Sequence, residues 1–403
     1  MMTGPGQTLG VSVFIDPMID GLGLTRSQLS TAYLIGTLAG ALGIPAIGRF
    51  LDTQGPRRAT AIIGVVFSVT LLWMAGIRGI VTLTVGFIGI RMLGQGGLTV
   101  IASTTPAHWF DRRRGFAIGV TTAVGSAATA IIPLVSTAII INYDWRRAWI
   151  VLAVAVWIIV LSIARWGLIN SPSDVGQYPD GIPPEATDDE DVARPTAAIE
   201  SVPSLTGSQA MRTPIFWALT ATVASGSMIT TALNFHQISI LGEQGLSPLE
   251  AAANFIPQTI AGLLISLYAG AAIDRFRQRF LLIGMATLLA ATMAGVNLVE
   301  PGLRAVAYGI VLGSTQGAMR SIESGSYPKL FGVKHAGEVR GVARSLSVAS
   351  SALGPLALAY GFQLTGSYRQ VLLVLLALPA AAAAFAMVAK EPLRRSGSGS
   401  RPA

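Results

Sequence analysis

Long apolar stretches separated by short polar loops run through most of the 403 residues. Eleven of these stretches are about 20 residues long, the length that a helix needs to cross the roughly 30 Å apolar core of a membrane. They cover residues 30–50, 59–76, 81–105, 115–141, 148–169, 214–241, 251–273, 280–299, 303–331, 341–364 and 371–389. The pattern predicts an all-α integral membrane protein.

A further span at the start of the chain is short. Only residues 1–15 precede Asp16-Pro17 and Asp20-Gly21, which are typical of a loop. At about 1.5 Å per residue this segment extends about 22 Å, less than the apolar core. We therefore expect twelve transmembrane helices, the first of them truncated at its N-terminus, with the true start codon upstream.

Several residues recur at one fixed interval. The pairs that lie 222 positions apart are Gly23 and Gly245, Leu24 and Leu246, Gly48 and Gly270, Asp52 and Asp274, and Arg57 and Arg279. Such repeats are typical of secondary transporters, in which two halves move about a site between them. The repeat predicts two pseudo-symmetric six-helix bundles, residues 1–169 and residues 213–390.

The two predicted bundles are separated by residues 170–212, where prolines, glycines and the acidic run 188–191 break the apolar pattern. This composition cannot bury enough apolar surface to order itself, so we expect a flexible cytoplasmic linker. Both a passive tether and a regulatory docking segment fit such a composition. Residues 391–403 are expected to be a cytoplasmic tail.

Composition and charge agree with a membrane protein, because 52% of the residues are hydrophobic and only 12% are charged. The loops after the second, fourth, eighth and tenth spans hold thirteen Arg and Lys residues, whereas the loops on the other side hold six. The positive-inside rule then places both termini in the cytoplasm. The expected location is a bacterial-type plasma membrane. The net charge of +8 is explained by topology and by contact with anionic membrane lipids, so nucleic-acid binding is not expected.

Chemistry on the protein itself is not expected. The chain has no cysteine, and His108, His236 and His335 lack the spacing of metal ligands. Gly4-Pro5-Gly6 resembles a phosphate loop only faintly, since no strand precedes it and no Lys-Ser/Thr follows. Because no nucleophile–base pair or paired carboxylates appear either, we predict neither an enzyme nor a cofactor.

Three motifs point to one family. Residues 48–58 (GRFLDTQGPRR), with residues 270–279 as a weaker second copy, resemble the signature loop of the major facilitator superfamily. Residues 91–97 (RMLGQGG) and residues 144–147 (DWRR) resemble further elements of that family. The resemblance covers nearly the whole chain and implies twelve helices in two six-helix halves.

Within the superfamily, the segments 4–10, 109–115 and 331–341 resemble the monocarboxylate and oxalate/formate transporter branch. Members of that branch usually carry an arginine four residues before the loop glycine of the eighth helix, where it holds the substrate carboxylate. Here that position is Ser266, so the anion-binding charge is expected elsewhere. The drug exporters of the superfamily usually show a Gly-Pro element in the fifth helix, where this chain has Gly125-Ser126.

Ionisable side chains inside a membrane are costly and usually functional, which singles out Arg91, His236, Arg320 and Glu323. Arg91 and Arg320 fall near mid-depth, one in each half, and a guanidinium binds a carboxylate through two parallel hydrogen bonds. Either arginine is therefore a candidate for binding substrate. The alternative is that each only pairs with carbonyl groups or neighbouring side chains.

Two candidates for proton coupling follow. Glu323 lies three residues after Arg320, so the two can pair on one helix, and protonation of Glu323 would free Arg320 for an anion. A static salt bridge fits equally well. His236 could relay protons or line the outer entrance, or it could be an interfacial hydrogen-bonded residue.

Neutral polar residues add to the candidate site. Asn234, Gln7 and Gln258 are expected to orient a ligand, although each could equally hold neighbouring helices together by hydrogen bonds. The repeated loop residues are candidates for gating, because carboxylates and arginines at helix ends can hold one side closed. They are Gly48, Asp52, Arg57, Gly270, Asp274 and Arg279, which could also do no more than enforce topology.

The sequence therefore predicts a monomeric secondary active transporter that works by alternating access. Its expected cargo is a small organic anion, most simply a monocarboxylate, moved by proton symport or anion exchange. Its expected partners are that anion, protons and membrane lipids. Proton-coupled efflux of drug-like or other small compounds is the alternative.

Overall fold

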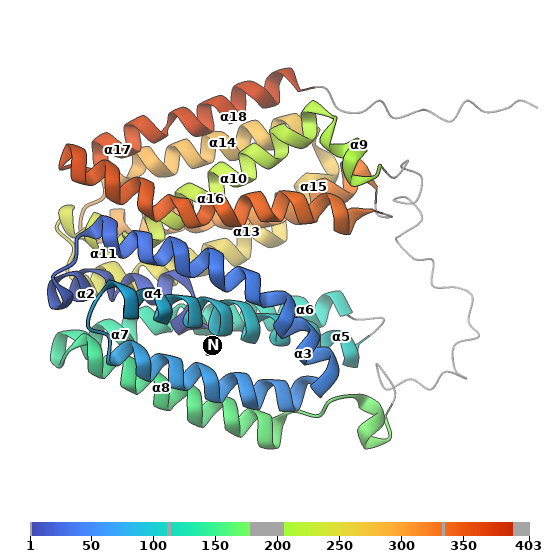
Figure 1. Ribbon diagram of the computed structural model, residues 1–403. Helices are drawn as coiled ribbons and strands as arrows, with labels where there is room; N and C mark the ends of the chain where they lie inside the picture. The colour runs from blue at the N-terminus through green and yellow to red at the C-terminus, as the bar shows by residue number, and fades with distance from the viewer. Residues whose placement is uncertain (1, 111–113, 178–204, 333–334, 390–403) are drawn as a thin grey trace, which may run out of the picture.

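The computed structural model describes residues 2–110, 114–177, 205–332 and 335–389, and all regular structure in this part is helical. Figure 1 shows the helices of the first half of the chain, blue to green, forming one group and those of the second half, yellow-green to red, forming another. The predicted linker and tail lie largely outside the described residues. The end of the molecule near residues 177 and 205 is called the linker end, and the opposite end the far end.

The first half contains six consecutive spans. They consist of η1 (Gly4–Gly6), α1 (Thr8–Ser12) and α2 (Ile15–Leu22); the two halves of α3 (Arg26–Ala75); α4 (Ile80–Gly89), the π-helix η2 (Ile90–Leu98) and α5 (Thr99–Trp109); α6 (Arg114–Thr129) and α7 (Ile131–Asn142); and α8 (Trp145–Ser162) with η3 (Ile163–Gly167). A short helix, η4 (Pro172–Val175), follows.

The second half also contains six spans, after the short helix α9 (Gly207–Met211). They are α10 (Pro214–Phe235) with α11 (Gln237–Glu243); α12 (Pro248–Ala253) with α13 (Phe255–Arg275); α14 (Gln278–Gly295) with η8 (Val296–Leu298); α15 (Leu303–Phe331); α16 (Ala336–Thr365); and α17 (Tyr368–Leu375) with α18 (Ala377–Val388).

Nine helices of the described residues are long and apolar enough to cross a membrane. One of them, α3, contains two spans, because its backbone departs from helical geometry at Gly55 (φ 74°, ψ 161°). Adding α15 and the broken first span gives the twelve helices that the apolar pattern predicts.

The sequence repeat appears as a repeated turn at the far end. Gly23 and Gly245 both adopt the left-handed conformation, with φ of 63° and 87°. In each copy the amide of the following leucine donates to the carbonyl five residues earlier, at 3.1 Å. This is the hydrogen bond of a Schellman helix cap, and glycine adopts the required φ without steric cost.

A repeated capping box follows each of these turns. The hydroxyl oxygen of Thr25 accepts from the amide of Gln28 while the Gln28 side chain accepts from the amide of Thr25. Ser247 and Glu250 exchange the same two bonds 222 positions later. Turn and cap together fix where the second span of each half begins.

The signature loop is fastened to its own half. The backbone amide of Arg57 donates to the Oδ1 atom of Asn170 at 3.0 Å, and its guanidinium donates to the carbonyl oxygens of Ala164 and Arg165 at 3.1 and 2.9 Å. These are carbonyls at the C-terminal end of the sixth span, which no further helical turn would satisfy. Arg57 thereby ties the third span to the sixth at the linker end.

The two halves are joined at the far end by a polar cluster. Asp16 of α2 forms an ion pair with Arg26 of α3, with 2.6 Å between Oδ1 and Nη2. Ser239 of α11 donates to both carboxylate oxygens of Asp16 at 2.9 and 2.7 Å, and the Nη1 atom of Arg26 lies 2.9 Å from its hydroxyl. A second bridge runs from Ser27 to Gln363 at 2.7 Å. This far-end cluster connects side chains more than 200 positions apart.

Glycines allow the helices around the centre to approach closely. A Cβ atom at Gly313 of α15 would lie 2.0 Å from the carbonyl oxygen of Gln258, and one at Gly317 would lie 2.3 Å from that of Gly262. In the first half, a Cβ atom at Gly6 would lie 2.4 Å from a carbonyl of the fourth span. Small residues permit such contacts between membrane helices, and here they position the polar residues of the centre.

Candidate functional site

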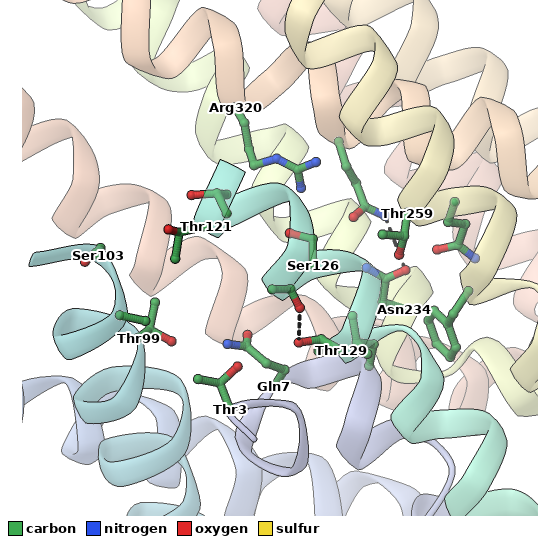
Figure 2. Close-up of a pocket in the computed structure, with 17 residues that line it drawn as sticks. Thr3, Gln7, Thr99, Ser103, Thr121, Ser126, Thr129, Asn234, Thr259 and Arg320 are labelled. Carbon is green, nitrogen blue, oxygen red and sulfur yellow. Dashed lines mark hydrogen bonds between the residues drawn. The ribbon is translucent and has the colours of Figure 1, made fainter. Parts of the chain in front are cut away.

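A cavity of about 310 Å³ lies between the two halves, with walls from α1, α5, α6, α10, α13 and α15 (Figure 2). Eight of its lining residues carry hydroxyl groups: Thr3, Thr99, Ser103, Thr121, Thr122, Ser126, Thr129 and Thr259. Four carry amides: Gln7, Asn234, Gln258 and Gln316. Hydrogen-bonding side chains therefore predominate among the lining residues, and the hydroxyls come almost entirely from the first half of the chain.

Arg320 is the charged residue of this lining, and no acidic side chain accompanies it among the described residues. Its side chain is exposed, and the space to which it is exposed is the cavity, into which the guanidinium points in Figure 2. Gly262 makes room for it, because a Cβ atom there would lie 3.0 Å from Nη2. Within the described part of the chain Arg320 makes no hydrogen bond and no ion pair, so its positive charge is available to a ligand.

Glu323 does not pair with Arg320 as the sequence suggested. Its carboxylate accepts two hydrogen bonds from the Nη1 atom of Arg344 on α16, at 2.9 and 3.2 Å. Three residues correspond to about 300° of helical rotation, so the two side chains leave α15 in directions about 60° apart. Arg320 reaches the cavity, whereas Glu323 reaches α16.

Arg91 lies outside the cavity lining, which differs from the prediction that it contacts substrate. It is only 5% exposed, and its Nη1 atom donates to the carbonyl oxygen of Gly6 at 3.2 Å and to the hydroxyl of Thr8 at 3.4 Å. Its guanidinium carbon also lies 4.9 Å from the centre of the Tyr33 ring. The carbonyl belongs to the break between η1 and α1, where Gln7 has an extended backbone. Arg91 therefore stabilises the broken first span.

His236 is likewise packed away from the cavity. It is 1% exposed and lies between α10 and α11, and its Nε2 atom is 2.9 Å from the carbonyl oxygen of Pro355 on α16. The rings of Phe235 and Tyr368 lie 5.0 and 5.9 Å from its own. This is the packing of a hydrogen-bonded residue that joins helices.

The three neutral candidates do line the cavity. Gln7 of the first half and Asn234 of the second are both half-buried, and Asn234 accepts a hydrogen bond of 3.4 Å from Gln316. Gln258 is buried and donates to Gln237 at 2.7 Å and to Asn254 at 3.0 Å. Gln258 thus combines both roles considered for it, since it meets the cavity and also holds helices together.

Sequence reasoning did not identify the hydroxyl-bearing wall. Thr99 and Ser103 are four positions apart on α5, and Thr122, Ser126 and Thr129 follow at intervals of four and three on α6. Such spacing places side chains on one helical face. A polar face on an otherwise apolar span was the signal that could have revealed these residues.

The proposed gating residues differ in their surroundings. Asp52 is exposed at the linker end, and Gly48 has no atom within 4 Å of the position a Cβ would take. Arg279 lies over the ring of Phe280, with 4.8 Å between guanidinium carbon and ring centre. The side chain of Asp274 and the surroundings of Gly270 lie outside the described residues. Their gating role stays a prediction.

Comparison with known families fits this architecture. Residues 3–355 match the model of the Major Facilitator Superfamily. The chain belongs to this superfamily. It is a multi-pass integral membrane transporter and not an enzyme, and the predicted fold of twelve helices in two bundles is confirmed.

Solved structures show the same fold. A crystal structure of a bacterial homolog to the human lysosomal transporter Spinster, in an inward-facing and unoccupied conformation, has a TM-score of 0.69 and 16% sequence identity, over 96% of this chain and 93% of that chain. An inward-facing and occupied conformation gives a TM-score of 0.67 and 15% identity over the same shares. At this level of identity the likeness concerns the fold alone.

A match to a curated protein covers less of the chain. The riboflavin transporter RibJ of Trypanosoma brucei brucei (strain 927/4 GUTat10.1) is 26% identical over 151 residues, which are 37% of this chain and 27% of that protein. Because the match spans so little of the relative's length, it leaves the substrate of this superfamily member open.

The contrast between the two arginines predicts opposite effects on stability. Arg91→Met should lower the melting temperature of the purified protein by several degrees, because it leaves a buried carbonyl without a donor, at a cost on the order of 2 kcal/mol. Arg320→Met should leave the melting temperature unchanged or raise it, because an unpaired charge disappears. Thermal unfolding in detergent compares the variants, and an equal loss in both would contradict the assignment.

Proposed function

We propose that this superfamily member is a secondary active transporter that moves a small organic anion, most simply a monocarboxylate, by alternating access. The observation that carries the proposal is the unpaired guanidinium of Arg320 in a cavity lined otherwise by neutral groups. One unpaired positive charge in the wall of a cavity attracts anions and disfavours cations. Substrate binding is assigned to Arg320, Gln7, Asn234 and Gln258.

A second candidate is transport of a neutral polar compound, which would include the predicted efflux of drug-like compounds. It is favoured by the many hydroxyl and amide groups of the lining and by the short match to a riboflavin transporter. The two candidates differ in the role they give to Arg320. A neutral substrate would not need the charge, whereas an anion would lose its counter-charge with it.

The dependence on Arg320 is measured in proteoliposomes. Arg320→Gln should reduce uptake of a labelled carboxylate at least tenfold, because a charge-assisted bidentate contact contributes about 1.5–3 kcal/mol. Arg304→Gln is the matched control, since Arg304 pairs with Glu300 on an exposed surface (2.5 Å) and should transport normally. Carboxylate uptake by Arg320→Gln at the rate of the unaltered protein would contradict the assignment of Arg320 as the counter-charge of the substrate.

We infer that proton coupling, as opposed to anion exchange, would act through the Glu323–Arg344 pair. The pair connects α15, which carries Arg320, to α16, so protonation of Glu323 would release one helix from the other. His236 is the less suitable candidate because of its packing against Pro355.

The coupling role of Glu323 has its own test. Glu323→Gln mimics the protonated carboxyl group and should leave anion exchange intact while removing the acceleration of uptake by an imposed pH gradient. Uptake is measured with and without the gradient, with Glu300→Gln as the control because Glu300 forms an ion pair with Arg304 on an exposed surface. Gradient-driven uptake that persists in Glu323→Gln would rule out this residue as the coupling site.

The far-end cluster supports a direction of opening. With Asp16, Arg26 and Ser239 linking the halves at one end, we propose that the structure is the state closed at the far end. The linker end faces the cytoplasm in this proposal, with both termini there, as the distribution of basic loop residues suggests. The transporter is placed in a bacterial-type plasma membrane as a monomer.

Removing Ser239 should loosen the closed state without breaking the Asp16–Arg26 ion pair. Ser239→Ala loses the hydrogen bond that the hydroxyl shares between both oxygens of Asp16 and the one that it accepts from Arg26, which shifts the equilibrium toward opening at the far end by about tenfold for each 1.4 kcal/mol lost. The chain has no cysteine, so a cysteine at Ser126 reports the opening through its reaction with an impermeant thiol reagent from the far side. Ser345→Ala is the control, because Ser345 bonds only within its own helix. An unchanged reaction rate in Ser239→Ala would contradict the proposal that Ser239 holds the far end closed.

A further inference from the structure

The cavity also limits what kind of anion fits, and this inference rests on the proposed function above. Of its lining side chains, the apolar ones are Leu9, Ala102 and Phe255, with Gly125 beside them. Ligand pockets are usually lined mainly by hydrophobic and aromatic groups. A lining in which most side chains carry hydroxyls or amides is therefore unusual, and it offers a ligand hydrogen-bonding groups along its walls.

The polar groups of the wall are able to bond a ligand. Ser103 and Thr129 donate to the carbonyl oxygens of Val100 and Gly125, at 3.0 and 2.7 Å, so their own oxygens are left as acceptors for ligand hydroxyls. Filling this wall with methylene groups would remove water from polar atoms without replacing its hydrogen bonds, which costs about 1–3 kcal/mol for each unsatisfied group. Ligand hydroxyls would replace those bonds.

Other lining side chains have no competing partner. Within the described residues the side chains of Gln7, Thr99 and Ser126 make no hydrogen bond, although all three line the cavity. Gln7 offers both a donor and an acceptor, and each hydroxyl offers the same. The first half of the chain thus presents a surface with unused hydrogen-bonding capacity.

The positive charge of Arg320 lies at some distance from the side chains of Gln7 and Thr3. In Figure 2 the guanidinium of Arg320 enters from the opposite side of the cavity to Gln7 and Thr3, with Thr121 and Ser126 between them. A single cation at one side of the cavity can bind one carboxylate. The polar side chains elsewhere in the lining can bind hydroxyls along the rest of the ligand. The volume of about 310 Å³ lies at the lower end of the range of about 300–1,000 Å³ that is usual for small-molecule pockets, which suits a small ligand.

We propose that the substrate is a polyhydroxylated monocarboxylate of the aldonate type, whose carboxylate binds Arg320 and whose hydroxyls bind the polar wall of α5 and α6. This narrows the small organic anion of the proposed function to one chemical class. It also assigns specificity to Thr99 and Ser126, which sequence reasoning had not identified as binding residues.

Three probes of equal carbon number test the proposal. Gluconate carries the carboxylate and the hydroxyls, hexanoate only the carboxylate, and glucitol only the hydroxyls. Thermal shift titrations of the purified protein should give gluconate at least a tenfold higher affinity than either of the others, because each lost hydrogen bond or charge contact costs about 1 kcal/mol or more.

Two variants locate the hydroxyl contacts. Thr99→Val and Ser126→Ala should each weaken gluconate binding about threefold to tenfold and leave hexanoate binding unchanged or stronger, since they remove a hydroxyl and keep the charge. Thr84→Val is the matched control, because Thr84 lies outside the cavity lining and bonds only to the carbonyl oxygen of Ile80 (2.8 Å).

The outcomes separate this inference from the proposed function. Hexanoate binding as tightly as gluconate, or Thr99→Val weakening both acids equally, would overturn the polyhydroxylated substrate while leaving an Arg320-dependent anion transporter in place. Hexanoate binding that depends on Arg320, with no effect of gluconate, would do the same. Binding of glucitol and gluconate with equal affinity, unaffected by Arg320→Gln, would overturn both proposals.

Discussion

Inside a membrane no water is available to the backbone, so every amide and carbonyl must find its partner within the chain. The twelve spans meet this condition by being helical, and the difficulty is then concentrated where helices break or end. At those places arginine side chains supply the missing donors. Arg91 donates to a carbonyl at the break in the first span, Arg57 to carbonyls at the end of the sixth, and Arg146 to the carbonyls of Ala75 and Ile77 at 2.8 and 3.0 Å after the third. The ends and breaks of these spans are thereby satisfied within the first half of the chain.

Arg320, in contrast, does not supply a donor to a broken or ending helix. It lies on an unbroken stretch of α15, and among the described residues no carbonyl or carboxylate accepts from it. A cation kept without a partner at such a place costs free energy in the isolated protein, and binding of an anion would recover that cost. The proposed opening at the far end avoids such a cost, because the ion pair between Asp16 and Arg26 stays within the first half when Ser239 moves away. Opening then breaks hydrogen bonds between the halves without leaving an isolated charge.

The sequence was sufficient for the fold and for part of the cavity. Span lengths and the 222-residue repeat predicted the two bundles, and the turns at Gly23 and Gly245 show why the repeat persists, since both positions need a left-handed backbone. Gln7, Asn234 and Gln258 were identified as polar residues of apolar spans, and all three line the cavity. Arg91 was placed there by the same reasoning and lies elsewhere, because depth in the membrane does not say whether a side chain reaches a ligand or a backbone break.

Apolar stretches, charged loops and repeated turns can be read from the order of residues along the chain. The sequence alone therefore determined the number of spans, their division into two halves and the family. Which polar side chains meet depends on the rotation of each helix and on how closely its neighbours approach. Glycines such as Gly262 and Gly313 set those distances through contacts about 50 positions away in the chain. Only the tertiary structure could therefore decide that Glu323 pairs with Arg344, that Arg320 faces a wall of hydroxyls, and that Ser239 of the second half donates to Asp16 of the first.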